Sequence, residues 1–227
     1  MKKRLLAVGL IAVLALSGCA ADKATFTDDD AKAILFGQVT QGSLTSLGLT
    51  PSSNTIATDS VKNYVAGVTD ADAGIDPASC ANSARLLILA DQDKESADTF
   101  YALPNLTSGS TVIGVKARLF GSDSAAQKFI AEFQKANEGC PKFTAVNNGS
   151  TDQVEVTVSE AAKDDKGFRL DTVAGVNNQL LTIRTYIVRE SNLAVAVQAK
   201  INSDDDANLL VAASAAIYEQ LTNGQAE

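Results

Sequence analysis

The residues that could carry chemistry are limited, because the chain has three cysteines and no histidine. A Ser-His-Asp triad, a Cys-His dyad and a histidine-ligated zinc site all need an imidazole group, so the sequence excludes them. A Ser-Lys pair or a glycosidase-like carboxylate pair remains, and Glu155 and Asp171 are acidic residues close to predicted strands. Exposed carboxylates are common on strands, so we expect no enzyme, no catalytic residue, no cofactor and no metal. A carboxylate-based hydrolase is the least favoured alternative.

Cys19 stands at the end of a segment that is typical of a secretory signal peptide. The segment has three basic residues at positions 2–4, an apolar run over residues 5–16, and small residues at its end. The run is too short to cross a bilayer as a helix, which takes about 20 residues. The sequence Leu16-Ser17-Gly18-Cys19 resembles the lipobox of bacterial lipoproteins, in which signal peptidase cuts before the cysteine and its sulfur receives a diacylglyceryl group.

The lipobox resemblance implies a signal peptide over residues 1–18 and an anchor with palmitate-type acyl chains on Cys19. The protein would then be attached to the cell membrane on its extracytoplasmic face, since several acyl chains hold a protein firmly. The alternative is an ordinary cleaved signal peptide, with Cys19 as an incidental residue of the mature chain.

The charge of the remaining chain argues against some partners. Three of the 19 basic residues lie within residues 1–18, so the rest of the chain has 16 basic and 27 acidic residues, a net charge of −11. Nucleic acids and anionic lipid surfaces are bound through clustered Lys and Arg, so we expect no nucleic-acid partner. The length fits a tether over residues 19–27 and a single domain over residues 28–227.

Cys80 and Cys140 form an even pair if Cys19 is lipidated. In an oxidising compartment such a pair is normally a disulfide, and we predict that the two are bonded. The alternative is two free, buried thiols.

The pattern of apolar residues changes from helical to strand-like along the chain. Apolar residues recur at helical spacing over residues 126–136, whereas residues 153–159, 180–188 and 193–201 alternate between apolar and polar. A turn at Glu190-Ser191-Asn192 would join the last two segments as a hairpin. We therefore predict an α+β fold: an antiparallel sheet of about five to six strands, helices packed on one face of it, and one disulfide.

Capping residues predict where helices begin. Thr27 precedes three aspartates, which suit the positive end of a helix, and the same triplet recurs before the last helix. Asp76 followed by Pro77 predicts another helix start, with Cys80 in the first turn. Residues 40–58 are rich in Ser, Thr and Gly, and we expect a loop with a strand-like segment at 44–49.

Three groups of residues resemble one known family. They are Asp76-Pro77-Ala78-Ser79-Cys80, the strand–glycine–helix segment 115–140 that ends at Cys140, and the final hairpin with its Ala-rich helix. Together they resemble the PknH-like extracellular sensor domain of actinobacteria, found on receptor kinases and as stand-alone lipoproteins. The family often has a Trp before the second cysteine and a later second disulfide, and both are missing here. The resemblance implies binding of an extracellular ligand in a groove of the sheet, without established catalysis.

The function expected from the sequence is therefore a lipid-anchored ligand-binding or sensor module. Its ligand would be a small molecule or an envelope component, and the candidate binding residues are Arg184, Tyr186 and Arg169 on the polar face of the late strands. Such residues are also common on any solvent-facing strand. The alternative is an envelope interaction protein or chaperone that contacts a protein partner through residues 40–76. A large apolar pocket would favour the first function and a flat surface the second.

Overall fold

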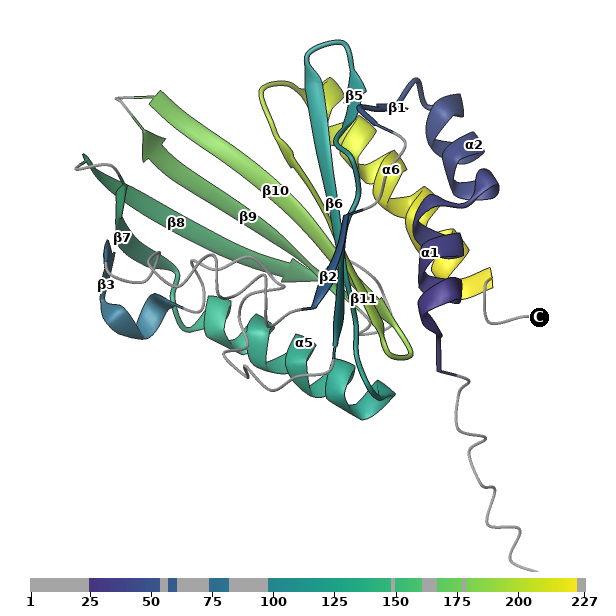
Figure 1. Ribbon diagram of the computed structural model, residues 1–227. Coiled ribbons are helices and arrows are strands. Elements are labelled where there is room, and N and C mark those ends of the chain that lie inside the picture. The colour runs from purple at the N-terminus through teal and green to yellow at the C-terminus, as the bar shows by residue number, and fades with distance from the viewer. Residues whose placement is uncertain are drawn as a thin grey trace, which may run out of the picture.

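The chain forms a large antiparallel sheet with helices on both sides, as its computed structural model shows (Figure 1). The residues that the structure describes are 25–53, 57–60, 74–81, 98–147, 150–160, 167–176 and 179–223. Its helices are α1 (Asp28–Phe36), α2 (Gln38–Ser46), the 3-10 helix η2 (Ala78–Cys80), α5 (Asp123–Glu138) and α6 (Asp204–Asn223). Its strands are β1 (Thr50–Pro51), β2 (Ala57–Ser60), β3 (Ile75–Asp76), β4 (Thr99–Ala102), β5 (Leu106–Ser108), β6 (Thr111–Leu119), β7 (Lys142–Asn147), β8 (Ser150–Glu160), β9 (Gly167–Val176), β10 (Gln179–Glu190) and β11 (Leu193–Lys200).

The predicted α+β class and antiparallel sheet are confirmed, but the sheet is larger than expected. Within the described residues it has eleven strands. Nine of them follow the order β1-β5-β6-β11-β10-β9-β8-β7-β3, while β4 pairs with the C-terminal half of β6 and β2 pairs with β4. The strands that exceed the predicted five to six are mainly short ones of two to four residues, such as β1, β2 and β3. The alternation of apolar and polar residues cannot be recognised in segments this short, so the sequence did not predict these strands.

Helices cover both faces of the sheet, so the expectation of helices on one face was wrong. In β11, Leu193, Val195 and Val197 belong to a core cluster that contains α6, whereas Ala194 and Ala196 belong to a second cluster that contains α5. We call the side of the sheet with Leu193 the α6 face and the side with Ala194 the α5 face.

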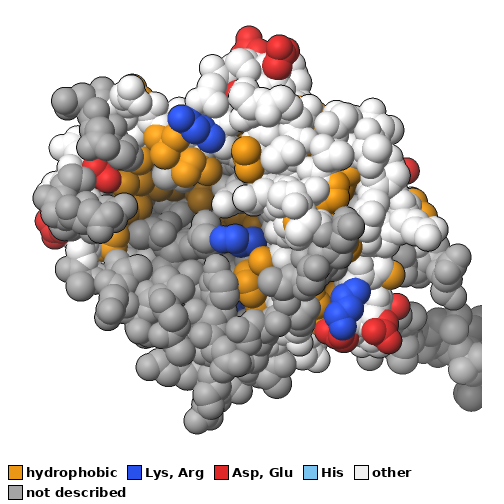
Figure 2. All heavy atoms as spheres, turned by 45° about the horizontal axis from the view of Figure 1, so that its top comes forward, with side chains coloured by type: hydrophobic (Ala, Val, Ile, Leu, Met, Phe, Trp, Pro, Cys, Tyr) orange, Lys and Arg blue, Asp and Glu red, His pale blue; other side chains and the backbone are white. Residues whose placement is uncertain are grey.

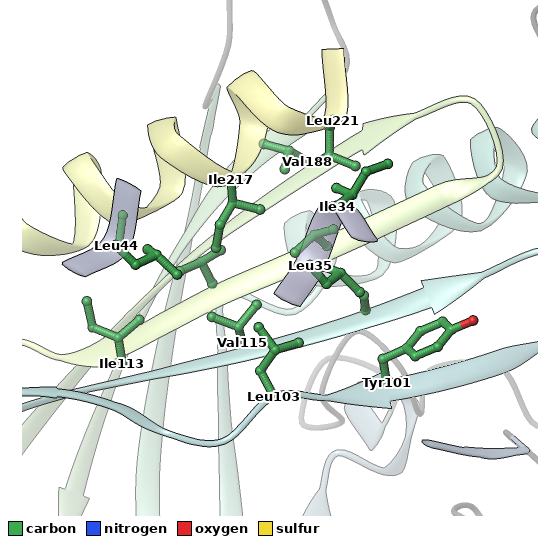
Figure 3. Packing of buried hydrophobic residues seen from close by; sticks show 14 of the residues in the cluster. Ile34, Leu35, Leu44, Tyr101, Leu103, Ile113, Val115, Val188, Ile217 and Leu221 are labelled. Atoms are coloured by element: carbon green, nitrogen blue, oxygen red, sulfur yellow. The ribbon is translucent and has the colours of Figure 1, made fainter. Parts of the chain in front are cut away.

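The core on the α6 face is formed by α1, α2 and α6 packing on β4, β6 and β11 (Figure 3). In this view Leu35 of α1 and Ile217 of α6 lie over Val115 of β6. The predicted cap of α1 is present: the Asp30 amide donates to Thr27 Oγ1 over 3.2 Å, and the Thr27 amide donates back to Asp30 Oδ2 over 2.8 Å. This reciprocal bonding satisfies amides that the helix itself leaves without partners.

The core on the α5 face contains the disulfide, whose prediction is confirmed. Cys80 and Cys140 are bonded and both are buried, with Phe133 and Phe143 in the same cluster. The bond joins η2 to the segment between α5 and β7. The helix predicted to start at Asp76 and Pro77 begins slightly later, because Asp76 is the last residue of β3 and the 3-10 helix η2 starts at Ala78. Cys80 is buried in the first turn, as predicted. The remainder of that predicted helix lies outside the described residues.

The predicted hairpin between β10 and β11 is confirmed, and its turn is buried. Asn192 is 4% exposed. Its side-chain amide nitrogen donates to the carbonyl oxygens of Phe26 and Phe120 over 3.1 and 2.9 Å, and its oxygen accepts from the Phe26 amide over 2.7 Å. Phe26, which lies in the range predicted as a tether, is thereby fixed to the sheet. Among the described helices, none is long and apolar enough to cross a membrane.

Candidate ligand-binding faces of the sheet

The structure brings together the three residues predicted to bind a ligand. Side chains of a strand alternate between its two sides, and the register pairs Tyr186 with Arg169 and Arg184 with Asp171. Tyr186 also packs against the core cluster of the α6 face. All four side chains therefore lie on the α6 face, on the adjacent strands β9 and β10.

These side chains form an ion-pair cluster. Arg184 Nε lies 2.7 Å from Asp171 Oδ1, Arg184 Nη2 donates to Asp171 Oδ2 over 3.3 Å, and Arg169 Nε lies 3.3 Å from the same Oδ2. Hydrogen bonding to Asp171 is the main cause that raises the pKa of Arg184 above its usual value, so this guanidinium is firmly charged. Two cations share one carboxylate, which leaves one positive charge in excess. The Nε and Nη2 atoms of Arg184 already donate to Asp171, so a ligand anion would have to compete with that carboxylate.

The carboxylates considered for hydrolysis are engaged in ion pairs. Glu155 Oε1 lies 2.7 Å from the Lys142 ammonium, and hydrogen bonding to that lysine lowers the pKa of Glu155. Thr157 pairs with Asp171, so Glu155 and Asp171 are diagonal neighbours across β8 and β9, with both carboxylates held by cations. A glycosidase acid needs a raised pKa, which is the opposite of what Glu155 has. Among the described residues, no three His, Cys, Asp or Glu are grouped so that they could hold a metal.

The α5 face has a different character, because it keeps apolar side chains that neither core uses. Leu181, Ile183 and Thr185 of β10 and Thr172 of β9 are half-buried on this face. Among the described residues, Leu181 and Ile183 belong to neither core cluster and pack against neither of them. Half-buried apolar side chains outside a core are typical of surfaces that bind small ligands.

Figure 2 shows a hollow in the surface beside a group of hydrophobic side chains, with Lys or Arg side chains near it at two places. On the α5 face, the half-buried apolar residues above are accompanied by Lys116 of β6 and Lys200 of β11. The opposite face of β8 to β10 is instead polar and charged, with Glu155, Asp171 and its arginines. We use the name α5-face hollow for the surface of the α5 face around Leu181, Ile183, Thr185 and Lys116.

Lys116 is the residue of this hollow that the sequence analysis missed. It is half-buried, and burial lowers the pKa of its ammonium group. The local signal was a lysine between Val115 and Ala117, inside a strand that is largely apolar. That signal does not say which face the lysine occupies, and only the pairing of Lys116 with Ala196 of β11 and Ala102 of β4 places it on the α5 face.

Comparison with known proteins finds similar solved structures but no similar sequence family. No protein-family model matches the chain, and no curated protein matches it. Among solved structures, the extracellular domain of PknH from Mycobacterium tuberculosis matches 87% of this chain and 99% of its own, with a TM-score of 0.57 and 9% identity. A Mycobacterium smegmatis protein described as an Rv0999 ortholog matches 77% of this chain and 95% of its own, with a TM-score of 0.45 and 14% identity.

The class that these findings define is an α+β domain with a large antiparallel sheet and one disulfide between η2 and the end of α5. More particularly, the chain has the fold of the PknH extracellular domain. The resemblance found in the sequence is thus confirmed for the fold.

Proposed function

We propose that this protein is an extracytoplasmic sensor module that binds a small ligand in the α5-face hollow and has no catalytic activity of its own. The observation that carries the proposal is the apolar wall of the hollow, where Leu181 and Ile183 are half-buried yet packed into neither core. Preformed concave sites with apolar walls and few polar groups are typical of small-ligand binding. These apolar residues favour binding of a small ligand over the alternative function, which is interaction with an envelope protein through a flat surface.

Two observations support an extracytoplasmic place of action. The Cys80–Cys140 disulfide is of a kind that persists in oxidising compartments, and the neighbour in fold is itself an extracellular domain. The proposed attachment is a diacylglyceryl anchor on Cys19.

The anchor predicts that Cys19 alone carries the lipid. Cys19→Ala should abolish incorporation of labelled palmitate and move the protein from the membrane fraction to the soluble fraction. The matched control is Cys80→Ala, which removes a cysteine but should keep the label. Palmitate incorporation that persists in Cys19→Ala would contradict the anchor.

The binding site can be located by two neighbouring residues that face opposite ways. Ile183 lies on the α5 face, whereas Arg184 lies on the α6 face. The probe is the neutral dye N-phenyl-1-naphthylamine, titrated into the full chain carrying Cys19→Ala, so that no attached acyl chain competes. Ile183→Ser should weaken dye binding roughly tenfold through loss of apolar contact, and Arg184→Ser should leave it unchanged.

The two variants also separate the α5-face hollow from its competitor. The Arg169–Arg184 cluster is the second candidate site, because its one excess positive charge could hold an anion. Loss of binding only in Arg184→Ser would move the site to the α6 face, as the sequence analysis expected. Dye binding that does not saturate, or that neither variant changes, would overturn the proposed site in the hollow.

A further inference from the structure

Lys116 is a half-buried cation without a compensating charge in the described part of the chain. Within that part it has no hydrogen-bond or ion-pair partner, and burial is the sole cause of its lowered pKa. Moving an ammonium group out of water without a partner is costly. A strand position of this kind would be filled more favourably by an apolar residue, so the lysine needs another explanation.

Lys116 lies beside small residues of the neighbouring strands. Its cross-strand partners are Ala196 on β11 and Ala102 on β4. Ala196 is in turn paired with Ile187 of β10, so the row from Lys116 to Ile187 spans two strand spacings, about 10 Å. Ala196 and Ile187 are buried in the α5-face core, whereas Gln198 and Thr185 are half-buried. Because Thr185 pairs with Gln198, which pairs with Gly114, Lys116 lies at the border between that core and the half-buried surface.

The other charges on the α5 face do not neutralise Lys116. Arg118, two residues along β6, is paired with Asp98, and Lys200 adds a further positive charge at an exposed position. Asp152 of β8 lies on the same face, but four strand spacings from β6, about 19 Å. At that separation, and in salt, the attraction between the two charges is largely screened.

We propose that the ligand of the α5-face hollow is a small amphiphile whose carboxylate or phosphate group pairs with Lys116. Its hydrocarbon part would lie along Thr185, Ile183 and Leu181 of β10. The six residues from the row of Lys116 to Leu181 extend over about 20 Å, which suits a linear chain better than a compact ring. This inference rests on the proposed function, since it concerns the same hollow.

The test uses the full chain carrying Cys19→Ala and three competitors with the same chain length. Dodecanoate, dodecyl phosphate and dodecanol are used to displace N-phenyl-1-naphthylamine. We expect the two anions to bind roughly 10- to 100-fold more tightly than dodecanol, as charge-assisted hydrogen bonds allow, and the ratio between them identifies a carboxylate or a phosphate ligand. Lys116→Met should remove this preference without weakening dodecanol, and Lys116→Arg should retain it.

The matched control is Lys128→Met. It removes the same charge from the exposed side of α5 and should leave all three affinities unchanged. Lys116→Met should also melt at the same or a higher temperature, because an apolar side chain suits the site better when no ligand is present. A lower melting temperature would mean that the lysine has a structural role and would overturn the inference.

The remaining outcomes separate the two proposals. If dodecanol and dodecanoate bind equally in wild type, the anionic ligand is wrong while the apolar hollow stands. If none of the three displaces the dye and the dye itself does not saturate, both the ligand class and the proposed binding site are wrong.

Discussion

Removing the Cys80–Cys140 disulfide is expected to lower the free energy of unfolding by about 4 kcal/mol. The two cysteines are 60 residues apart in sequence, and the bond restricts the unfolded chain by closing a loop of that length. Cys80→Ala/Cys140→Ala should therefore lower the urea midpoint and reduce the melting temperature by roughly 8–16 °C. Both quantities can be measured by circular dichroism.

The third cysteine provides the control for this experiment. Cys19→Ala lies outside the loop and should leave the unfolding midpoint of the oxidised protein unchanged. Reductant should destabilise wild type to about the level of the double variant and should have no effect on that variant. A double variant that unfolds at the wild-type midpoint would show that the bond contributes nothing to stability.

Features with local signals could be predicted from the sequence. The Thr27 cap depends on residues within one helical turn, and the β10–β11 hairpin depends on two alternating segments around a short turn. The apolar stripe of α5 is likewise local, and Phe129 and Phe133 are buried as expected. These signals were sufficient for the α+β class.

Features set by tertiary contacts could not be predicted. Helix α2 has a Ser- and Thr-rich sequence with weak helix propensity, and the sequence indicated a loop there, yet Leu44 and Thr40 are buried against the core. The second helix layer was missed because Ala194 and Ala196 are small, and only the large residues of β11 were taken as its buried face.

The candidate site shows the same division. Arg184 and Tyr186 are two residues apart on one strand, so alternation alone places them on the same face. Arg169 joins them because the antiparallel pairing of β9 with β10 sets it opposite Tyr186. Lys116 is distant in sequence from Ile183 and reaches the same hollow only because β11 lies between β6 and β10. That order of strands has no signature in the sequence.

The buried pair of Arg118 and Asp98 supplies the second large effect. Arg118 is 1% exposed, and its Nε and Nη2 donate to Asp98 Oδ2 over 2.9 and 2.6 Å. The guanidinium carbon also lies 4.6 Å from the ring centre of Phe120 and 4.8 Å from that of Phe129. Asp98→Ala would leave this cation buried without its carboxylate, and we expect the free energy of unfolding to fall by about 3–5 kcal/mol.

A double variant distinguishes the penalty of an unpaired charge from the net contribution of the pair. Asp98→Ala/Arg118→Met replaces both charges, and the methionine can contact both phenylalanine rings. We expect it to unfold at a higher urea concentration than Asp98→Ala alone, because the cost of the single change comes from the arginine left behind. Glu132→Ala, which breaks an exposed ion pair on α5, should leave the midpoint unchanged. If Asp98→Ala is as stable as Glu132→Ala, the Arg118 charge must be compensated by other groups, and Asp98 is not its essential partner.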